Sequence, residues 1–81
     1  MSRSIRSARH RHLAELLLRH REAAGLKQAD VAARLGRHQP YISNIEAGQR
    51  RVDLVELIDL SEAIGFDLHQ LLDELVRTPK D

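Results

Sequence analysis

The sequence contains no cysteine and is poor in aromatic residues, with one Tyr, one Phe and no Trp. The absence of cysteine excludes disulfides, catalytic thiolates and cysteine-ligated zinc, so the core must be stabilised by packing alone. No uninterrupted apolar run is longer than that of Leu16–Leu18, whereas a helix that spans a membrane needs roughly 20 apolar residues. We therefore expect a soluble, cytoplasmic protein with no membrane partner.

The charge of the chain is divided unevenly, although its formal net value is only +1. Residues 1–51 carry eleven Lys or Arg against four acidic residues, a net of +7, and residues 52–81 carry two against eight, a net of −6. A basic first half predicts one surface that meets a polyanion, while the acidic half limits indiscriminate adhesion. From charge alone, an ordinary solvated surface explains the pattern equally well.

Apolar residues recur at helical spacing almost throughout, and strand signals are sparse, so the sequence predicts an all-α fold. Asp53 and Asp67 are good helix N-caps, and Glu56 lies in capping-box position after Asp53. The predicted helices cover residues 7–24, 28–35, 39–47, 54–64 and 68–76, and the first four are each followed by a glycine. We expect one domain over residues 7–76, a flexible basic arm at 1–6 and a short tail at 77–81.

The periodicity also predicts which side chains share the core. These are Leu13, Leu16, Leu17, Val31, Ala32, Leu35, Ile42, Ile45, Leu57, Leu60, Ile64 and Leu71. Any apolar surface left over on the fourth and fifth predicted helices is where we expect a homodimer contact, because a two-fold interface uses one patch twice.

The second and third predicted helices are short and are separated by only three residues, Gly36–His38. This is the spacing of a helix-turn-helix, whose second helix lies in the major groove of DNA. If Ile42 and Ile45 pack inward, the outer and leading surface of the third helix carries the candidate base-reading residues. They are Gln39, Pro40, Tyr41, Ser43 and Asn44. Gln and Asn amides pair with adenine, and a Tyr ring can pack against a thymine methyl group or touch a phosphate.

Basic residues flank the same helix, and we expect them to contact phosphates. Arg37 and His38 precede it in the turn, and Arg50 and Arg51 follow it. Further contacts could come from Arg3, Arg6, Arg9 and Arg11, which we group with the basic arm. For these four residues a solvated basic end is the favoured explanation.

Residues 26–51, LKQADVAARLGRHQPYISNIEAGQRR, resemble the XRE family of lambda-repressor-like and Cro-like regulators, and DLSEAIGFDLHQLL at 59–72 resembles its closing helices. The resemblance implies a five-helix lambda-repressor-like DNA-binding domain. It implies that Gln28 contacts a phosphate and that Glu46 forms a buried ion pair with Arg21. Several phage members carry a second glutamine at the position of Pro40, so their operator sequences do not transfer to this chain.

The expected function is therefore that of a sequence-specific transcription regulator of double-stranded DNA. We expect a repressor that binds a pseudo-palindromic operator as a homodimer, with no cofactor. No catalytic motif is visible, so we expect no enzyme activity. His10 and His12 point apart on a helix, so we expect no metal. A protein-interaction module such as an antitoxin, with DNA binding secondary, is the open alternative.

Overall fold

The computed structural model describes residues 7–79, which form five α-helices and no strand. The helices are α1 (Ala8–Ala23), α2 (Gln28–Arg34), α3 (Gln39–Glu46), α4 (Leu54–Ile64) and α5 (Leu68–Arg77). The predicted all-α, five-helix fold is confirmed, and each helix end lies within one residue of its predicted place. None of these helices has the length and apolar character to cross a membrane. The predicted arm at 1–6 lies outside the described residues, as do residues 80 and 81 of the tail.

Capping residues determine where the helices begin. Ser7 accepts a hydrogen bond from the backbone N–H of His10 at 3.0 Å, which starts α1. Asp53 accepts from the N–H of Glu56 at 2.7 Å, and the Glu56 carboxylate accepts from the N–H of Asp53 at 3.0 Å. This reciprocal pair is the capping box that the sequence predicted for α4. The side chain of Asp67 caps α5 in the same way as Ser7 caps α1.

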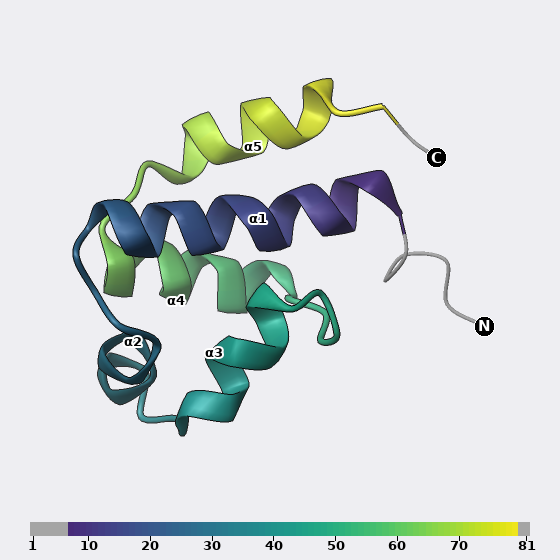
Figure 1. Cartoon of the computed structure of the whole chain (residues 1–81). Helices are drawn as coiled ribbons and strands as arrows, with labels where there is room; N and C mark the ends of the chain where they lie inside the picture. Colours follow the sequence, from purple (N-terminus) through teal and green to yellow (C-terminus); the bar gives the residue numbers. More distant parts are fainter. Residues whose placement is uncertain (1–6, 80–81) are drawn as a thin grey trace.

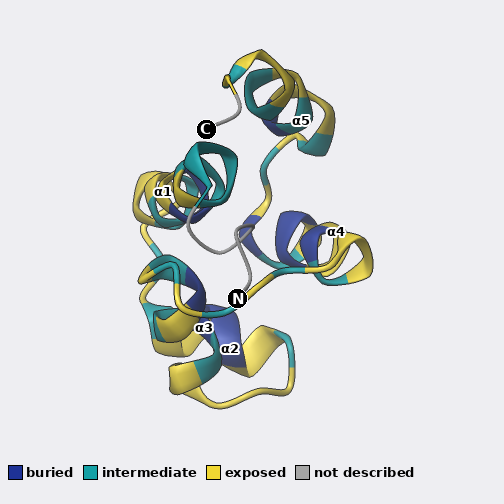
Figure 2. Cartoon of the chain, turned by 90° about the vertical axis from the view of Figure 1, so that its right-hand side faces the viewer, coloured by how far each residue is buried: buried dark blue, intermediate teal, exposed yellow. Residues whose placement is uncertain are grey.

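The helices are arranged in three levels. Figure 1 shows α2 and α3 at one end of the molecule and α5 at the other, with α1 and α4 between them. The buried sides of the helices face the interior (Figure 2). The core comprises Leu16, Leu17, Val31, Ala32, Ile42, Ile45, Leu57, Leu60, Ile64 and Leu71. Leu13 and Leu35, which we also expected to be buried, are partly exposed and pack against the edge of this cluster.

The start of α1 is attached to the end of α5. Nε of Arg9 donates to the carbonyl of Thr78 at 2.9 Å, and its Nη2 donates to that of Val76 at 3.2 Å. His12 contacts the Glu74 carboxylate at 2.8 Å through Nε2. Arg9 therefore satisfies carbonyls that the end of a helix leaves without intrahelical partners. Grouping Arg9 with the basic arm was wrong, because its side chain belongs to the α1–α5 contact.

Candidate nucleic-acid interface

A tight turn connects α2 to α3. Gly36 adopts a left-handed conformation with φ of 66°, and the N–H of Arg37 donates to the carbonyl of Ala32 at 2.8 Å. His38 is the N-cap of α3, and Pro40 lies in its first turn. Proline is tolerated there because the N–H groups of a first turn have no intrahelical acceptor. The sequence thus imposes two short helices with a fixed crossing, which is the arrangement of a helix-turn-helix.

The two sides of α3 differ sharply in burial. Ile42 and Ile45 are 3% and 2% exposed and attach the helix to the core. Among the candidate base-reading residues, Gln39, Pro40 and Asn44 are exposed, and Tyr41 and Ser43 are partly buried. The helix therefore presents the amides of Gln39 and Asn44 to solvent, and amides can form paired hydrogen bonds with a base edge.

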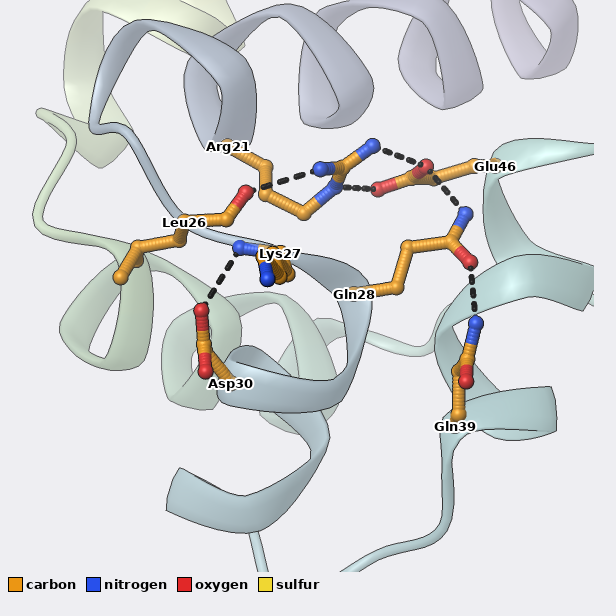
Figure 3. A network of polar contacts seen from close by, with 7 residues as sticks. All are labelled: Arg21, Leu26, Lys27, Gln28, Asp30, Gln39 and Glu46. Carbon is orange, nitrogen blue, oxygen red and sulfur yellow. Dashed lines mark hydrogen bonds and ion pairs between the residues drawn. The ribbon is translucent and has the colours of Figure 1, made fainter.

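A network of polar contacts joins α1, α2 and α3 (Figure 3). Arg21 in α1 donates to both carboxylate oxygens of Glu46, the last residue of α3, at 2.6 and 3.0 Å. It also donates to the carbonyl of Leu26 at 2.8 Å. The hydrogen bond to Glu46 raises the pKa of Arg21. The structure thus brings together the two residues for which the family resemblance implied an ion pair.

Gln28, the first residue of α2, extends this network to the surface. Its amide nitrogen donates to Glu46 at 2.8 Å, and its amide oxygen accepts from Nε2 of Gln39 at 3.0 Å. In Figure 3 the side chains of Glu46, Gln28 and Gln39 follow one another from the α1 contact to the start of α3. Gln28, which is itself bound to the Glu46 carboxylate, therefore orients the amide of Gln39, although Gln39 is exposed.

Two guanidinium groups lie over the ring of Tyr41. Cζ of Arg37 is 4.3 Å from the ring centroid and Cζ of Arg50 is 4.6 Å from it. Cations are attracted to the negative face of an aromatic ring. Burial raises the pKa of the Tyr41 hydroxyl, and the nearby Glu56 carboxylate raises it further. Arg37 in the turn before α3 and Arg50 in the turn after it thereby contact the same neutral side chain, that of Tyr41.

Arg50 is also paired with Glu56 of α4. Its Nη1 and Nη2 donate to the two carboxylate oxygens of Glu56 at 3.1 and 2.9 Å, and Nη1 also donates to the carbonyl of Arg51 at 2.9 Å. The hydrogen bond from Arg50 and that from the Asp53 N–H together lower the pKa of Glu56 to about 2. Glu56 therefore stays ionised and keeps Arg50 in place.

The remaining candidate phosphate ligands lie at the ends of the same helices. Arg37, His38 and Arg51 are exposed. Arg37 and His38 belong to the turn before α3, and Arg51 lies in the segment between α3 and α4. Together with Gln28 and Arg50, these residues place positive and hydrogen-bonding groups at both ends of the exposed face of α3.

Sequence reasoning did not find the role of Glu56 or the link between Gln28 and Gln39. The sequence predicted that Glu56 belongs to a capping box, and the structure confirms it. Its contact with Arg50 joins residues six positions apart, across a turn and the start of a helix, and no periodic pattern in the sequence predicts such a contact. Gln28 and Gln39 were assigned to phosphate and base separately. A contact between them depends on how α2 crosses α3, which the sequence alone does not give.

Comparisons with known proteins agree with this geometry. A family model for the helix-turn-helix domain matches residues 12–75. An uncharacterized HTH-type transcriptional regulator, y4dJ of Sinorhizobium fredii, is 36% identical over 59 residues, which are 73% of this chain and 77% of that protein. The family-model match spans α2, α3, the turn between them and the helices that follow.

Two solved structures have the same fold. An XRE-family like protein from Pseudomonas syringae pv. tomato superposes with a TM-score of 0.81 and 45% identity, over 89% of each chain. The restriction-modification controller protein C.AhdI from Aeromonas hydrophila superposes with a TM-score of 0.69 and 32% identity, over 74% of this chain and 87% of that one.

Proposed function

The chain belongs to the XRE family of helix-turn-helix proteins, and we propose that it is a transcription regulator that binds double-stranded DNA in a sequence-specific way. The observation that carries this proposal is the two-sided character of α3. Ile42 and Ile45 hold the helix in the core, while Gln39 and Asn44 face outward. A helix held in this way by a helix-turn-helix can enter the major groove.

The proposal divides the site residues by the part of DNA that they meet. The residues along α3 meet base edges or thymine methyl groups. These residues are Gln39, Pro40, Tyr41, Ser43 and Asn44. The residues at the helix ends meet phosphates, and such contacts fix position and register but do not read bases directly. These residues are Gln28, Arg37, His38, Arg50 and Arg51. Binding alone accounts for this activity, so it needs neither a catalytic group nor a cofactor.

We propose further that the protein binds DNA as a homodimer. Three exposed apolar residues gather at the start of α4, where Leu54, Val55 and Ile58 are 63%, 67% and 38% exposed. A second copy bound there would leave the exposed face of α3 uncovered, because the patch lies outside α2 and α3. One recognition helix reads too few base pairs to be selective, and a two-fold dimer presents two helices about 34 Å apart. The matching operator is pseudo-palindromic.

Repression is the proposed regulatory effect, since a dimer on a promoter blocks access of polymerase, and the nucleoid of the cytoplasm is the proposed place of action. The apolar patch on α4 also fits another occupant, namely a different protein such as the toxin partner of an antitoxin. In that case affinity for DNA would be weak or secondary. A measurement of DNA binding therefore distinguishes the two functions.

The test is selection of bound sequences from random duplex DNA, followed by titration of the selected duplex over a range of salt concentrations. We expect one pseudo-palindromic sequence to be enriched. We also expect affinity to fall steeply with salt, because each phosphate contact releases a counterion. Absence of enrichment together with weak, salt-independent binding would refute the proposed function and favour the interaction module.

A further inference from the structure

Glu56 lies outside α2 and α3, yet it is the residue that holds one of the candidate phosphate ligands. Its side chain is 17% exposed, and its oxygens accept two hydrogen bonds from Arg50 and one from the N–H of Asp53. The bond from Asp53 completes the capping box of α4. The bonds from Arg50 are not needed for capping, so they call for a separate explanation.

The Arg50 guanidinium is constrained from three directions. Glu56 binds its end, the carbonyl of Arg51 binds Nη1, and the ring of Tyr41 lies 4.6 Å from Cζ. An arginine has five N–H groups, and these contacts use three of them. The two others, one on Nε and one on Nη2, have no partner among the described residues. They are sufficient for a bidentate contact with one phosphate.

We propose that Glu56 is a positioning residue for DNA recognition that acts through Arg50. It holds the Arg50 guanidinium against Tyr41, so that the two unused N–H groups meet one phosphate in one register and the Tyr41 ring keeps one orientation in the first turn of α3. This inference rests on the proposed function, because it concerns how the same surface distinguishes its operator from other DNA.

The physical reason is a difference between a fixed and a free cation. A free arginine on a flexible side chain reaches a phosphate on any duplex, so it adds affinity without regard to sequence. A guanidinium held in one place rewards only the docking register in which a phosphate lies at that place. Glu56 therefore lowers affinity for random DNA and raises the relative affinity for the operator.

The experiment compares wild type with Glu56→Gln on two probes, the duplex selected by the wild type and a mixed-sequence duplex of equal length. Glutamine keeps an amide oxygen for the Asp53 N–H, as in other capping boxes, but it loses the charge that binds Arg50. We expect the ratio of operator affinity to mixed-sequence affinity to fall by about fivefold, the range of a partly exposed ion pair. A purely structural change would lower the active fraction and leave this ratio unchanged.

Glu62→Gln is the matched control, because it makes the same charge change at an exposed position of the same helix. Arg50→Lys is the second variant. It leaves the capping box intact and keeps the positive charge but loses the bidentate, ring-stacked geometry, so the ratio should fall here too. An unchanged ratio in both variants, or the same change in Glu62→Gln, would overturn the inference. If the wild type itself selects no sequence, the proposed function fails instead.

Discussion

Two arginine–glutamate pairs lie near the C-terminal end of α3, and they differ in how far water reaches them. Arg21 and Glu46 join α1 to α3 with an N–O distance of 2.6 Å and side-chain exposures of 12% and 5%. Arg50 and Glu56 join the following turn to α4 with a distance of 2.9 Å and exposures of 36% and 17%. Both carboxylates accept two hydrogen bonds from their arginine, so the chemistry is the same and only the surroundings differ.

The difference in burial assigns the two pairs different roles. A buried pair recovers its desolvation cost only when its remaining polar groups are satisfied as well. Leu26 and Gln28 supply those partners for Arg21 and Glu46. The Arg50 pair contributes less to folding because solvent screens it, but it keeps two N–H groups at the surface. The inner pair, Arg21 and Glu46, therefore fixes the position of α3. The outer pair, Arg50 and Glu56, orients the Arg50 guanidinium beside α3 for a ligand.

The largest expected effect comes from breaking the inner pair on one side. Arg21→Met leaves the Glu46 carboxylate buried with Gln28 as its polar partner. An uncompensated buried charge costs about 3 to 5 kcal/mol, so we expect the free energy of unfolding to fall by that amount. Denaturation by urea measures it.

The control for this prediction is Arg19→Met on the same helix. Arg19 pairs with Glu15 at 3.0 Å, but the two side chains are 61% and 53% exposed. An exposed pair is worth about 0 to 1 kcal/mol. The double variant Arg21→Met, Glu46→Leu should recover part of the loss, since it leaves no charge unpaired. If Arg21→Met and Arg19→Met cost the same, burial does not distinguish the pairs.

Much of the fold follows from local signals in the sequence. Asp53 with Glu56, Asp67 and the glycines after the first four helices specify helix ends through short-range hydrogen bonds and backbone conformation, which sequence alone reveals. Leu13 and Leu35 show where this reasoning stops. Their spacing matches the apolar stripe of a helix, but a residue at the edge of a stripe is covered only if a neighbouring helix reaches it. Here each packs against the core from its rim.

The sequence predicts the exposure of a site residue where the direction of one helix face determines it. It does not predict contacts between side chains from several elements. Exposure of Gln39 and Asn44 follows from the inward direction of Ile42 and Ile45. The contact of Arg21 with Glu46 was expected only from the family resemblance. Arg50 was expected to be a phosphate ligand. Its hydrogen bonds to Glu56 depend on the path of the turn after α3, which no sequence rule predicts.

A second prediction concerns the exposed face of α3, which the inner pair holds in place. Asn44→Ala should cost about 1 to 3 kcal/mol of binding free energy on the selected operator and little on mixed-sequence DNA, because only the correct base rewards its amide. Fluorescence anisotropy titrations on the two probes measure both values. Gln70→Ala, an exposed amide on α5 at the other end of the molecule, should change neither. Equal losses on the two probes would remove Asn44 from the base-reading set.

A third prediction contrasts Arg50 with its neighbour Arg51, whose side chain is exposed. Arg51→Ala should weaken binding to all duplexes by a similar factor and leave the preferred sequence unchanged, because a phosphate contact carries no sequence information. The slope of log affinity against log salt should become shallower by about one unit, since one fewer counterion is released. Binding measured at several salt concentrations tests this. A changed sequence preference would instead place Arg51 at a base.

The smallest expected effect is on stability and comes from the outer pair. The pKa of Glu56 is lowered from 4.5 to about 2 in the folded protein, so its ionised form stabilises the fold above pH 4.5. This contribution is lost as the pH falls through about 2. Because Arg50 is 36% exposed, we expect Glu56→Gln to reduce the free energy of unfolding by only about 1 kcal/mol at pH 6.

The pH dependence then measures what the charge of Glu56 contributes to stability. Urea titrations of wild type and Glu56→Gln at several pH values should show their difference shrinking from about pH 4.5 toward pH 2, because the protonated Glu56 no longer attracts Arg50. The Asp53 N–H also favours the ionised carboxylate, but the glutamine oxygen still accepts this hydrogen bond, so the difference between the variants comes mainly from Arg50. Glu62→Gln supplies the baseline for an exposed charge change on α4. A difference that stays constant with pH would mean that the charge of Glu56 does not stabilise the fold, and the contrast between the inner and the outer pair would then be lost.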